Sequence, residues 1–447
     1  MSQRLSRRTF VKSIAYAGAT LPLISPRLLR AASPNDKLNI AVIGTQAQAG
    51  FSIDNLRSQN IVALVDVDSK SLDSRVEDLR TNGGHNPTTY RDYRVMFDKE
   101  HKNFDAFVAA IPDHHHAQAA LRGMALGKHC YCEKPLAHTV QEVRLMSDLA
   151  KRNKLATQMG TQIHAGNNYR RVVEKIRAGV IGTIKEVHVW LYGRSYYGPQ
   201  LPDQPDPVPP TLDWDLWLGP AADRPYHEKV YHPFEWRCWL DFGGGTLTDM
   251  ACHWVDLPHW ALNLRQPESV LTYAPPPEEL RPPKYAMVEM RHQASGGRPP
   301  VTVTWHHGGT QIDKINVYKK FGIDNQKYPG SKTCFVGTDG ILLADYEKHH
   351  LLPEQKFQDY KCEQSIPNSI GHHAEWVKAC KEGTPTTCNF DYSGALTESV
   401  LLGMVSHRAG NVEVQYDAAH LRVSGAPDAQ RFITKPYRKG WEIEKAV

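Results

Sequence analysis

Residues 40–50 read IAVIGTQAQAG, an apolar run of strand type that ends at Gly44 and leads into a helical stretch. A dinucleotide-binding turn carries glycine at its first, third and sixth positions, where this sequence has Gly44, Gln46 and Ala49. Gly44 permits the tight turn and Ala49 is an accepted third residue, but Gln46 replaces the glycine that lets the backbone approach a pyrophosphate. The turn alone is a weak match.

Asp66 strengthens this interpretation, because it ends the second apolar run, residues 61–65, about 20 residues after the turn. A carboxylate at that place can bind the ribose hydroxyls of a dinucleotide, and it repels a 2′-phosphate. The pattern therefore favours NAD over NADP. A solvent-exposed aspartate at a strand end is the alternative.

Strand-like and helical segments alternate along the residues that follow. The apolar run 104–111 stops at Pro112, an alanine-rich helical stretch covers 117–126, and the strand-like HCYCEKP begins at His129. Strands that alternate with helices at these spacings are typical of a parallel, doubly wound sheet. We therefore predict an α/β dinucleotide-binding domain of the Rossmann type over residues 36–154.

The pattern changes after Gly160, where strands of alternating polarity are separated by proline-rich loops. The clearest strands of this kind are 184–192, 286–291 and 301–305. They indicate an open, mostly antiparallel sheet covered on one face, and so predict a C-terminal α+β domain over residues 155–447. We expect the helical segments 372–381 and 393–408 to pack where the two domains meet.

Residues 1–32 have the composition of an export signal. The opening MSQRLSRRTFVK contains Arg7 and Arg8 between Ser6 and Phe10, and a weakly apolar stretch and small residues follow. This arrangement resembles a twin-arginine signal. We therefore expect the twin-arginine export machinery as a partner and a periplasmic or otherwise exported protein. The apolar stretch is shorter than the ~20 residues of a spanning helix, and a basic surface helix is the alternative.

Charge and cysteine content argue against two other classes of protein. The net charge of +5 is spread along the chain without a basic run flanked by stacking aromatic residues, so we expect no nucleic-acid partner. The eight cysteines form no CxxC pair, and Cys130 and Cys132 are spaced too closely for two zinc ligands from one turn. We predict that the cysteines are core thiols.

Two further motifs follow predicted strands, PDHHH at 112–116 and GKHCYCEKPL at 127–136. Together with the turn at Gly44, they resemble the Gfo/Idh/MocA family of oxidoreductases. Family-like stretches continue along nearly all of the chain after the export segment, including GTIKEV, DFGGGTLTDMACHWVDLPHW and GTDGILL. EKP alone is a common tripeptide, whereas its order and spacing with the other segments are specific. The resemblance implies NAD as the cofactor.

The same resemblance implies that Lys134 projects from a strand end toward the nicotinamide and the substrate hydroxyl. An ammonium group at that place favours a developing alkoxide. The resemblance also places Pro112, His116 and Glu133 beside the cofactor. A solvated surface charge is the alternative for the lysine. A metal site at 114–116 is disfavoured, because alternate residues on a strand end or turn diverge.

Asp249 and His253 lie four residues apart in a segment that reads as a helix, so both side chains fall on one face. A histidine can take the hydroxyl proton during hydride loss, and a carboxylate beside it can hold the ring and stabilise its cation. The family places its catalytic histidine and acidic partner at these positions. A capping aspartate with a partly buried histidine is the simplest alternative.

A metal site is the second alternative for this segment. Asp249, His253, Asp256 and His259 could present ligands along one face, but a tryptophan and a proline interrupt the polar set. Hydride transfer also needs no ion. We therefore predict no metal.

Aromatic and basic residues just before the glycine run 243–245 suit a sugar site. The indole face of Trp236 can pack on pyranose C–H surfaces, and Arg237 can bind hydroxyls. Core aromatic residues are an equal alternative. His164, Tyr169 and Arg170, which follow Gly160, are further candidates for the substrate wall.

These features predict hydride transfer from a secondary hydroxyl of a sugar or polyol to NAD, with His253 as the base, Asp249 as its orienter and Lys134 as an electrostatic stabiliser. An NAD-dependent glycosidase or lyase that oxidises its substrate transiently, with tightly bound NAD, is a close alternative. A non-enzymatic sugar-binding protein of the same fold is another, for which Gln46 is the best argument. By analogy with the family, we expect a homo-oligomer built through an exposed sheet face.

Overall fold

The structure is a computed structural model that describes residues 37–193, 195–309 and 311–443. The export segment predicted at 1–32 lies outside the described residues. Within the described ranges, no helix is long and apolar enough to cross a membrane.

The first part of the chain forms a six-stranded sheet in which all neighbouring strands are parallel. Its strands, in spatial order, are β3 (Thr88–Tyr90), β2 (Asn60–Val65), β1 (Asn39–Ile43), β4 (Ala106–Ala109), β5 (His129–Cys132) and β6 (Thr157–Met159). The doubly wound parallel sheet predicted from the sequence is confirmed. The chain order reverses between β1 and β4, and the crevice at the carboxyl ends of such a pair is where α/β proteins bind ligands.

Helices cover both faces of this sheet, and they are α2 (Gln48–Leu56), α3 (Ser69–Gly83), α4 (Tyr93–Glu100), α5 (Asp113–Ala125), α6 (Val140–Arg152) and, from far along the chain, α13 (His372–Glu382). Alternate residues of β1 point to opposite faces. Ile40 and Val42 pack in one core with residues of α2, α3 and α13, whereas Ala41 and Ile43 pack in the other with residues of α4, α5 and α6. Burial on both sides explains why the strand is a continuous apolar run.

Two details of this domain differ from the sequence prediction. Residues 114–116 form the first turn of α5, so the prediction of a strand end or turn there is wrong. Pro112 supplies the extended backbone before the helix, and the acidic Asp113 is favourable in a first turn. The sheet also gains its last strand, β6, beyond the boundary predicted at residue 154.

The remainder of the chain forms a nine-stranded sheet, in which only β7 and β10 pair in parallel. Its strands, in spatial order, are β13 (His349–Leu352), β12 (Ile341–Ala344), β11 (Thr333–Gly337), β7 (Ile184–Leu191), β10 (Val301–His307), β9 (Ala286–His292), β8 (Ser269–Tyr273), β14 (Val414–Asp417) and β15 (Arg422–Ser424). The predicted mostly antiparallel sheet is confirmed. Strand β9 alternates buried and half-buried residues, which is the pattern of a sheet covered mainly on one face.

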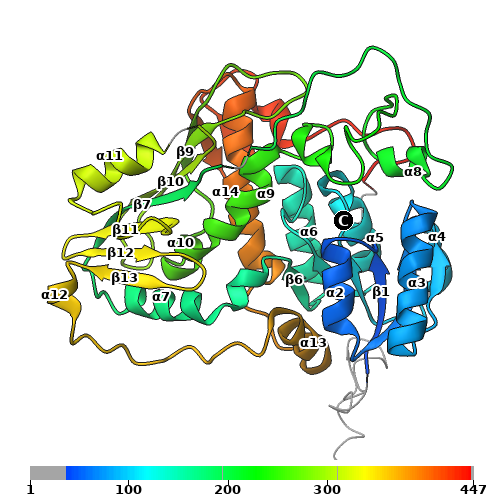
Figure 1. The fold of residues 1–447 in the computed structure, drawn as a ribbon, viewed down its shortest axis with the longest axis horizontal. Helices are drawn as coiled ribbons and strands as arrows, with labels where there is room; N and C mark the ends of the chain where they lie inside the picture. Colours follow the sequence, from blue (N-terminus) through cyan, green and yellow to red (C-terminus); the bar gives the residue numbers. More distant parts are fainter. Residues whose placement is uncertain (1–36, 194, 310, 444–447) are drawn as a thin grey trace, which may run out of the picture. The chain divides into compact units, whose positions relative to one another are not determined.

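The second part of the chain also contributes helices. They are α7 (Asn167–Arg177), α8 (Trp214–Leu218), α9 (Gly245–Trp254), α10 (Asp256–Ala261), α11 (Ile312–Lys320), α12 (Glu354–Phe357) and α14 (Phe390–Arg408), with short 3-10 turns at η2 (Gln162–Ala165), η3 (Glu235–Cys238) and η4 (Ala429–Ile433). Helix α14 is buried along nearly its whole length and contacts α6, α9 and β8 (Figure 1). The prediction that 372–381 and 393–408 pack at the junction is confirmed.

Residues 195–244, here called the covering segment, connect β7 to α9 and reach across to the parallel sheet. Their inner side is an aromatic cluster that includes Trp217, Tyr231 and Trp239. The backbone nitrogen of Ser69 donates to the carbonyl of Thr211 at 2.9 Å, which ties this segment to the start of α3. The covering segment therefore faces the carboxyl edge of the parallel sheet.

Candidate active site

A pocket lies at the carboxyl ends of β1, β2, β4 and β5, where the strand order indicates a ligand site. Its sheet side is lined by six residues that the sequence singled out, Gly44, Gln46, Asp66, Pro112, Glu133 and Lys134. Its opposite wall belongs to the covering segment and includes Trp236 and Arg237, which were predicted to bind substrate. Sequence positions that are far apart thus meet around one cavity.

The turn after β1 has the backbone geometry of a dinucleotide site. Gly44 has φ +95°, and a Cβ atom there would overlap the carbonyl oxygen of Ala110 on β4's side of the turn. Ala47, just before α2, has a left-handed φ of 47°. Ala49 is wholly buried behind the turn, so it supports the turn and does not line the pocket. Gln46 is exposed and lines the pocket.

Asp66 stands at the pocket edge with its carboxylate already held in place. Thr45 Oγ1 donates to one carboxylate oxygen at 2.6 Å, and the backbone nitrogen of Asp68 donates to the other at 3.0 Å. Burial is the main influence on this group, and it raises the pKa of Asp66. A fixed acceptor at this position is suited to ribose hydroxyls.

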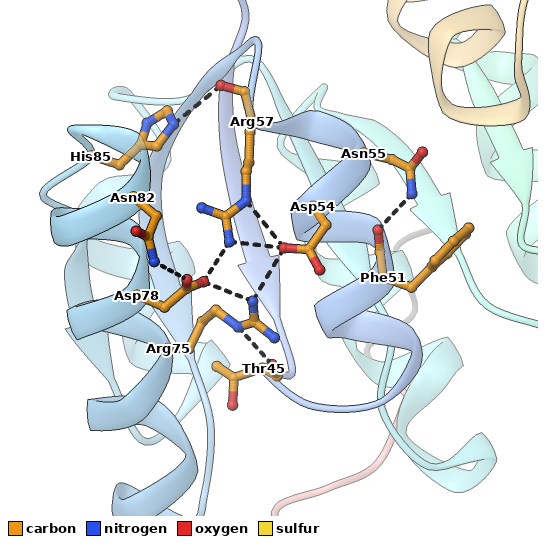
Figure 2. Close-up of polar contacts among 9 residues, drawn as sticks. All are labelled: Thr45, Phe51, Asp54, Asn55, Arg57, Arg75, Asp78, Asn82 and His85. Carbon is orange, nitrogen blue, oxygen red and sulfur yellow. Dashed lines mark hydrogen bonds and ion pairs between the residues drawn. The ribbon is translucent and has the colours of Figure 1, made fainter.

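A charged network on the outside of α2 and α3 holds the turn from behind (Figure 2). Arg57 and Arg75 both lie between Asp54 and Asp78, with nitrogen–oxygen distances of 3.0 Å from Arg75 to Asp78 and 2.9 Å from Arg57 to Asp54. Arg75 also donates through Nε to the carbonyl of Thr45 at 3.2 Å. Because these carboxylates are partly exposed, the network contributes more to the position of the turn than to stability.

Lys134, Asp249 and Arg237 form a buried charge cluster beside this pocket. Lys134 Nζ lies 2.5 Å from Asp249 Oδ1 and 3.0 Å from the carbonyl oxygen of Asp249, and Arg237 Nε lies 3.0 Å from the same carboxylate oxygen. Burial alone would raise the pKa of Asp249, but the Lys134 and Arg237 cations outweigh it and hold this pKa well below its ordinary value. Asp249 is therefore a carboxylate at any physiological pH.

His253 follows Asp249 by one turn of α9, as predicted, and its ring is neutral. Burial first, and the Lys134 cation second, lower the pKa of His253 to about 3, while Asp249 acts in the opposite direction. The Asp249 carboxylate makes its hydrogen bonds to Lys134 and Arg237, so its influence on the His253 ring is electrostatic. A neutral imidazole can accept a proton.

Glu133, next to Lys134, is a buried carboxylic acid with a raised pKa. Burial raises its pKa to about 7, although the Lys134 cation opposes this. Gln162 donates to Oε1 at 2.7 Å, whereas Oε2 has no hydrogen-bond partner among the described residues. A side chain at Gly160 would overlap this carboxyl group, so the glycine there leaves room for it.

The three further substrate candidates do not line this pocket. His164 is wholly buried, and its Nδ1 lies 2.9 Å from the Asp256 carboxylate while its ring stacks on Trp260. Tyr169 is also wholly buried and donates to the carbonyl oxygen of His253 at 3.2 Å. Arg170 donates to the carbonyl of Pro367 at 3.1 Å. In this structure they support α9 and α10 from behind.

His116 likewise lies behind the pocket wall. Its ring nitrogens lie 2.8 Å from the carbonyl oxygen of Pro135 and 2.7 Å from that of Ile111, so it joins the two segments that follow β4 and β5. Its neighbour His115 lines the pocket instead and meets Tyr93 Oη at 3.1 Å.

We did not predict several of the pocket residues from the sequence. They are Thr45, Tyr93, His115, Trp217, Phe234 and Trp441. Phe234 could have been found, because it alternates with Trp236 in FEWRCW, and the two rings flank the Arg237 guanidinium at 4.3 and 4.1 Å. Trp441 reaches the pocket only through tertiary folding. Within the described ranges, no three His, Cys, Asp or Glu side chains gather as a metal site.

Comparison with known proteins agrees with this geometry. Residues 38–161 match the Gfo/Idh/MocA model described as an oxidoreductase family with an NAD-binding Rossmann fold, and residues 178–276 match that family's C-terminal alpha/beta domain. A curated relative, a glycosyl hydrolase family 109 protein of Shewanella pealeana, is 26% identical over 218 residues, which cover 43% of this chain and 46% of the relative. The chain thus spans less than half the length of that relative.

Solved structures share the fold at low identity. The WlbA dehydrogenase of Bordetella pertussis, in complex with NADH and UDP-GlcNAcA, matches 85% of this chain and 99% of its own with a TM-score of 0.57 and 15% identity. The aldose-aldose oxidoreductase of Caulobacter crescentus matches 85% of this chain and 100% of its own with a TM-score of 0.54 and 14% identity. Residues 38–161 and 178–276 are thus similar to the two domains of the Gfo/Idh/MocA oxidoreductases, and the first is an NAD-binding Rossmann domain.

Proposed function

We propose that this protein oxidises a secondary hydroxyl group of a sugar or polyol with NAD, through Lys134, Asp249 and His253. The observation that carries the proposal is the ion pair between Lys134, which lines the cofactor pocket, and the charged carboxylate of Asp249, with the neutral imidazole of His253 one turn further along the same helix. The aromatic residues Phe234 and Trp236 on the opposite wall support a sugar as the substrate, since indole and phenyl faces pack on its C–H surfaces.

The pocket residues fit NAD. Gly44 permits the tight turn, where a Cβ atom would overlap the Ala110 carbonyl oxygen, and the turn leads into the N-terminus of α2, which favours a pyrophosphate. Asp66 offers carboxylate oxygens to a ribose and would repel a 2′-phosphate. Bound NAD supplies the acceptor for the hydride.

Side chains of this protein accept the proton of the substrate hydroxyl and stabilise the charges that develop during the reaction. His253 takes the proton of the substrate hydroxyl, because its ring is unprotonated at neutral pH. Lys134 stabilises the alkoxide character that develops on the same oxygen. Asp249 remains ionised beside them and stabilises the imidazolium ion that forms. Arg237 keeps Asp249 in place from the substrate side.

A second candidate, an NAD-dependent glycosidase or lyase with retained NAD, is favoured by the similarity to glycosyl hydrolase family 109 proteins. The covering segment and Trp441 line the side of the pocket away from the sheet. Arg91 donates to the carbonyls of both Val67 and Thr211, which fastens this cover to the rim. Transient oxidation of a sugar acidifies the C–H bond beside the new carbonyl, so that a glycosidic substituent can leave by elimination; in the glycosidase, water then adds to the resulting double bond before the carbonyl is reduced again.

One experiment separates the two net reactions. NADH and sugar product are followed together during many turnovers of the purified protein. An ordinary dehydrogenase releases free NADH in proportion to product and needs added NAD. The redox-neutral enzyme forms product without releasing NADH and without added NAD. A protein that neither contains nor binds NAD by calorimetry would exclude both and would leave the sugar-binding protein.

Export by the twin-arginine route and homo-oligomerisation are also proposals. The first rests on the sequence of residues 1–32, and it agrees with retained NAD, because a protein exported in the folded state can carry a cofactor loaded in the cytoplasm. Replacement of Arg7 and Arg8 by lysine should stop export and leave a folded cytoplasmic protein. Normal periplasmic accumulation of that variant would refute the route.

A further inference from the structure

A second cavity, of about 580 Å³, lies next to the glycine run that precedes α9. Gly243 and Gly244 line it, and Gly243 also packs against Trp236 of the cofactor pocket. The rest of its wall comes from the covering segment, Thr248 of α9, the start of α6, the last turns of α14 and the C-terminal segment 431–438. The proposed reaction uses none of these wall residues.

Four cations line this cavity, and two of them have no acidic partner. Arg438 pairs with Asp215 and Asp223, and Lys435 pairs with the buried Glu142 at 3.0 Å. The remaining two are Arg408 and Arg431, for which no carboxylate lies within ion-pair distance among the described residues. The one acidic residue of the lining, Asp241, is paired with Arg224.

The two unpaired guanidinium groups share one aromatic ring. Arg408 lies 4.5 Å and Arg431 4.6 Å from the ring centroid of Phe432. Arg408 and Arg431 are both exposed residues, and the pKa of Arg408 is lowered first by partial desolvation of its guanidinium group and then by the charge of Arg431. Leu401, Met404 and Val405 make the adjoining surface apolar.

The lining also includes a hydrogen-bonding group without a partner among the described residues. Thr248 is 2% exposed and lines the cavity, and its Oγ1 has no hydrogen-bond partner among the described residues. It lies in the first turn of α9, whose N-cap residue, Gly244, has no side chain to cap the helix. A buried hydroxyl, an uncapped helix start and two unpaired guanidinium groups all favour an anion.

We propose that this cavity is a second ligand site, which binds a small molecule whose carboxylate or phosphoryl group lies between Arg408 and Arg431. The planar guanidinium groups suit the paired oxygens of such an anion. The apolar surface beside them accommodates the body of the ligand, and Thr248 provides a hydrogen bond. Acidic sugars and sugar phosphates share this chemistry. The site does not depend on the proposed reaction.

The test is calorimetric titration of the purified full chain with inorganic phosphate, glucuronate and glucose 6-phosphate. We expect saturable binding of at least one probe, weakened by ~10-fold or more in the double variant Arg408→Gln, Arg431→Gln. Glucuronate alone would identify a carboxylate site, and either phosphate probe would identify a phosphoryl site. The matched control is Arg80→Gln, which removes an exposed charge on α3 and should bind as the wild type does.

A second variant protects the test against a folding defect. Thr248→Val keeps the shape of the side chain and removes only the hydroxyl group, so it should weaken the same probe by a few-fold with an unchanged unfolding curve. Two results would overturn the proposal: no saturable binding of any probe, or equal binding by wild type and both variants. A double variant that changes oligomeric state in light scattering, when no probe binds, would assign the cavity to a subunit interface instead.

Discussion

Asp249 and Asp256 are buried carboxylates on adjoining helices, and their surroundings are opposite. Asp249 is bonded by two permanent cations, Lys134 and Arg237, both of which line the cofactor pocket. Asp256 is wholly buried and is bonded by His164 and by Tyr392, whose hydroxyl lies 2.6 Å from its Oδ1. The metal alternative considered from the sequence placed Asp249 and Asp256 in one site, because both are carboxylates on one predicted helical face. Residue type and spacing therefore do not distinguish a residue that takes part in the reaction from one that supports the fold.

The difference indicates different roles for Asp249 on α9 and Asp256 on α10. Around Asp249, net positive charge lies at the place where negative charge would develop in the reaction. Around Asp256, polar donors neutralise a charge that stays away from the pocket, so that α10 is fixed to η2 and α14. We infer that Asp249 acts on the reaction and Asp256 acts on the fold.

The largest expected effect is a loss of stability in the variant Asp256→Asn. Loss of this charge leaves His164 and Tyr392 with a poorer acceptor, and breaking such a buried pair should cost about 3 kcal/mol in the free energy of unfolding. Turnover per folded molecule should change little. Urea unfolding and turnover on the same sample measure both, and a fully stable but inactive variant would contradict the scaffold role.

The next effect concerns the reaction itself. Lys134→Ala and His253→Ala should each lower turnover by ~10²-fold or more with NAD affinity nearly intact, and Asp249→Asn should lower it less than loss of the histidine. Exposed counterparts, Lys70→Ala and His420→Ala, serve as controls. Wild-type turnover in either active-site alanine variant would remove that residue from the mechanism.

Glu133 predicts a pH dependence of stability. Its pKa is about 7 in the folded protein against an ordinary value of 4.5, so between these values the folded state keeps a proton that the unfolded chain releases. Stability is therefore lost as pH rises through this window. We expect Glu133→Gln, which cannot ionise, to gain about 3 kcal/mol relative to wild type as the pH rises through this window. A difference that is constant with pH, in urea unfolding, would contradict the raised pKa.

Asp66 gives the smallest expected effect. Asp66→Ala should weaken NAD binding by ~10-fold and relax discrimination against NADP, because the ribose acceptor and the repulsive charge are lost together. Asp73→Ala, an exposed aspartate on α3, is the control. Calorimetry measures the affinity of both variants for NAD and for NADP. An unchanged preference of Asp66→Ala for NAD would show that another group selects the cofactor.

The sequence predicted those parts of the molecule that depend on local patterns. The parallel sheet follows from continuous apolar runs, and the positions of Gly44, Asp66 and Lys134 follow from strand ends, which necessarily meet at one edge. The histidines at 114–116 were misplaced because a helix start after proline resembles a turn in sequence. Trp441 and Trp217 could not be predicted to line the pocket, since only long-range packing brings them there.

The most direct test of the central claim is reduction of the protein's own nucleotide. Purified wild type and His253→Ala are mixed with candidate sugars and polyols, the NADH absorbance is followed, and the nucleotide is then released by denaturation and identified by mass. We expect NAD to be present and to be reduced in the wild type by at least one sugar, and much more slowly in the variant. Equal reduction in both would contradict His253 as the base, and a wild type that holds no nucleotide and binds none would contradict the NAD-dependent enzyme altogether.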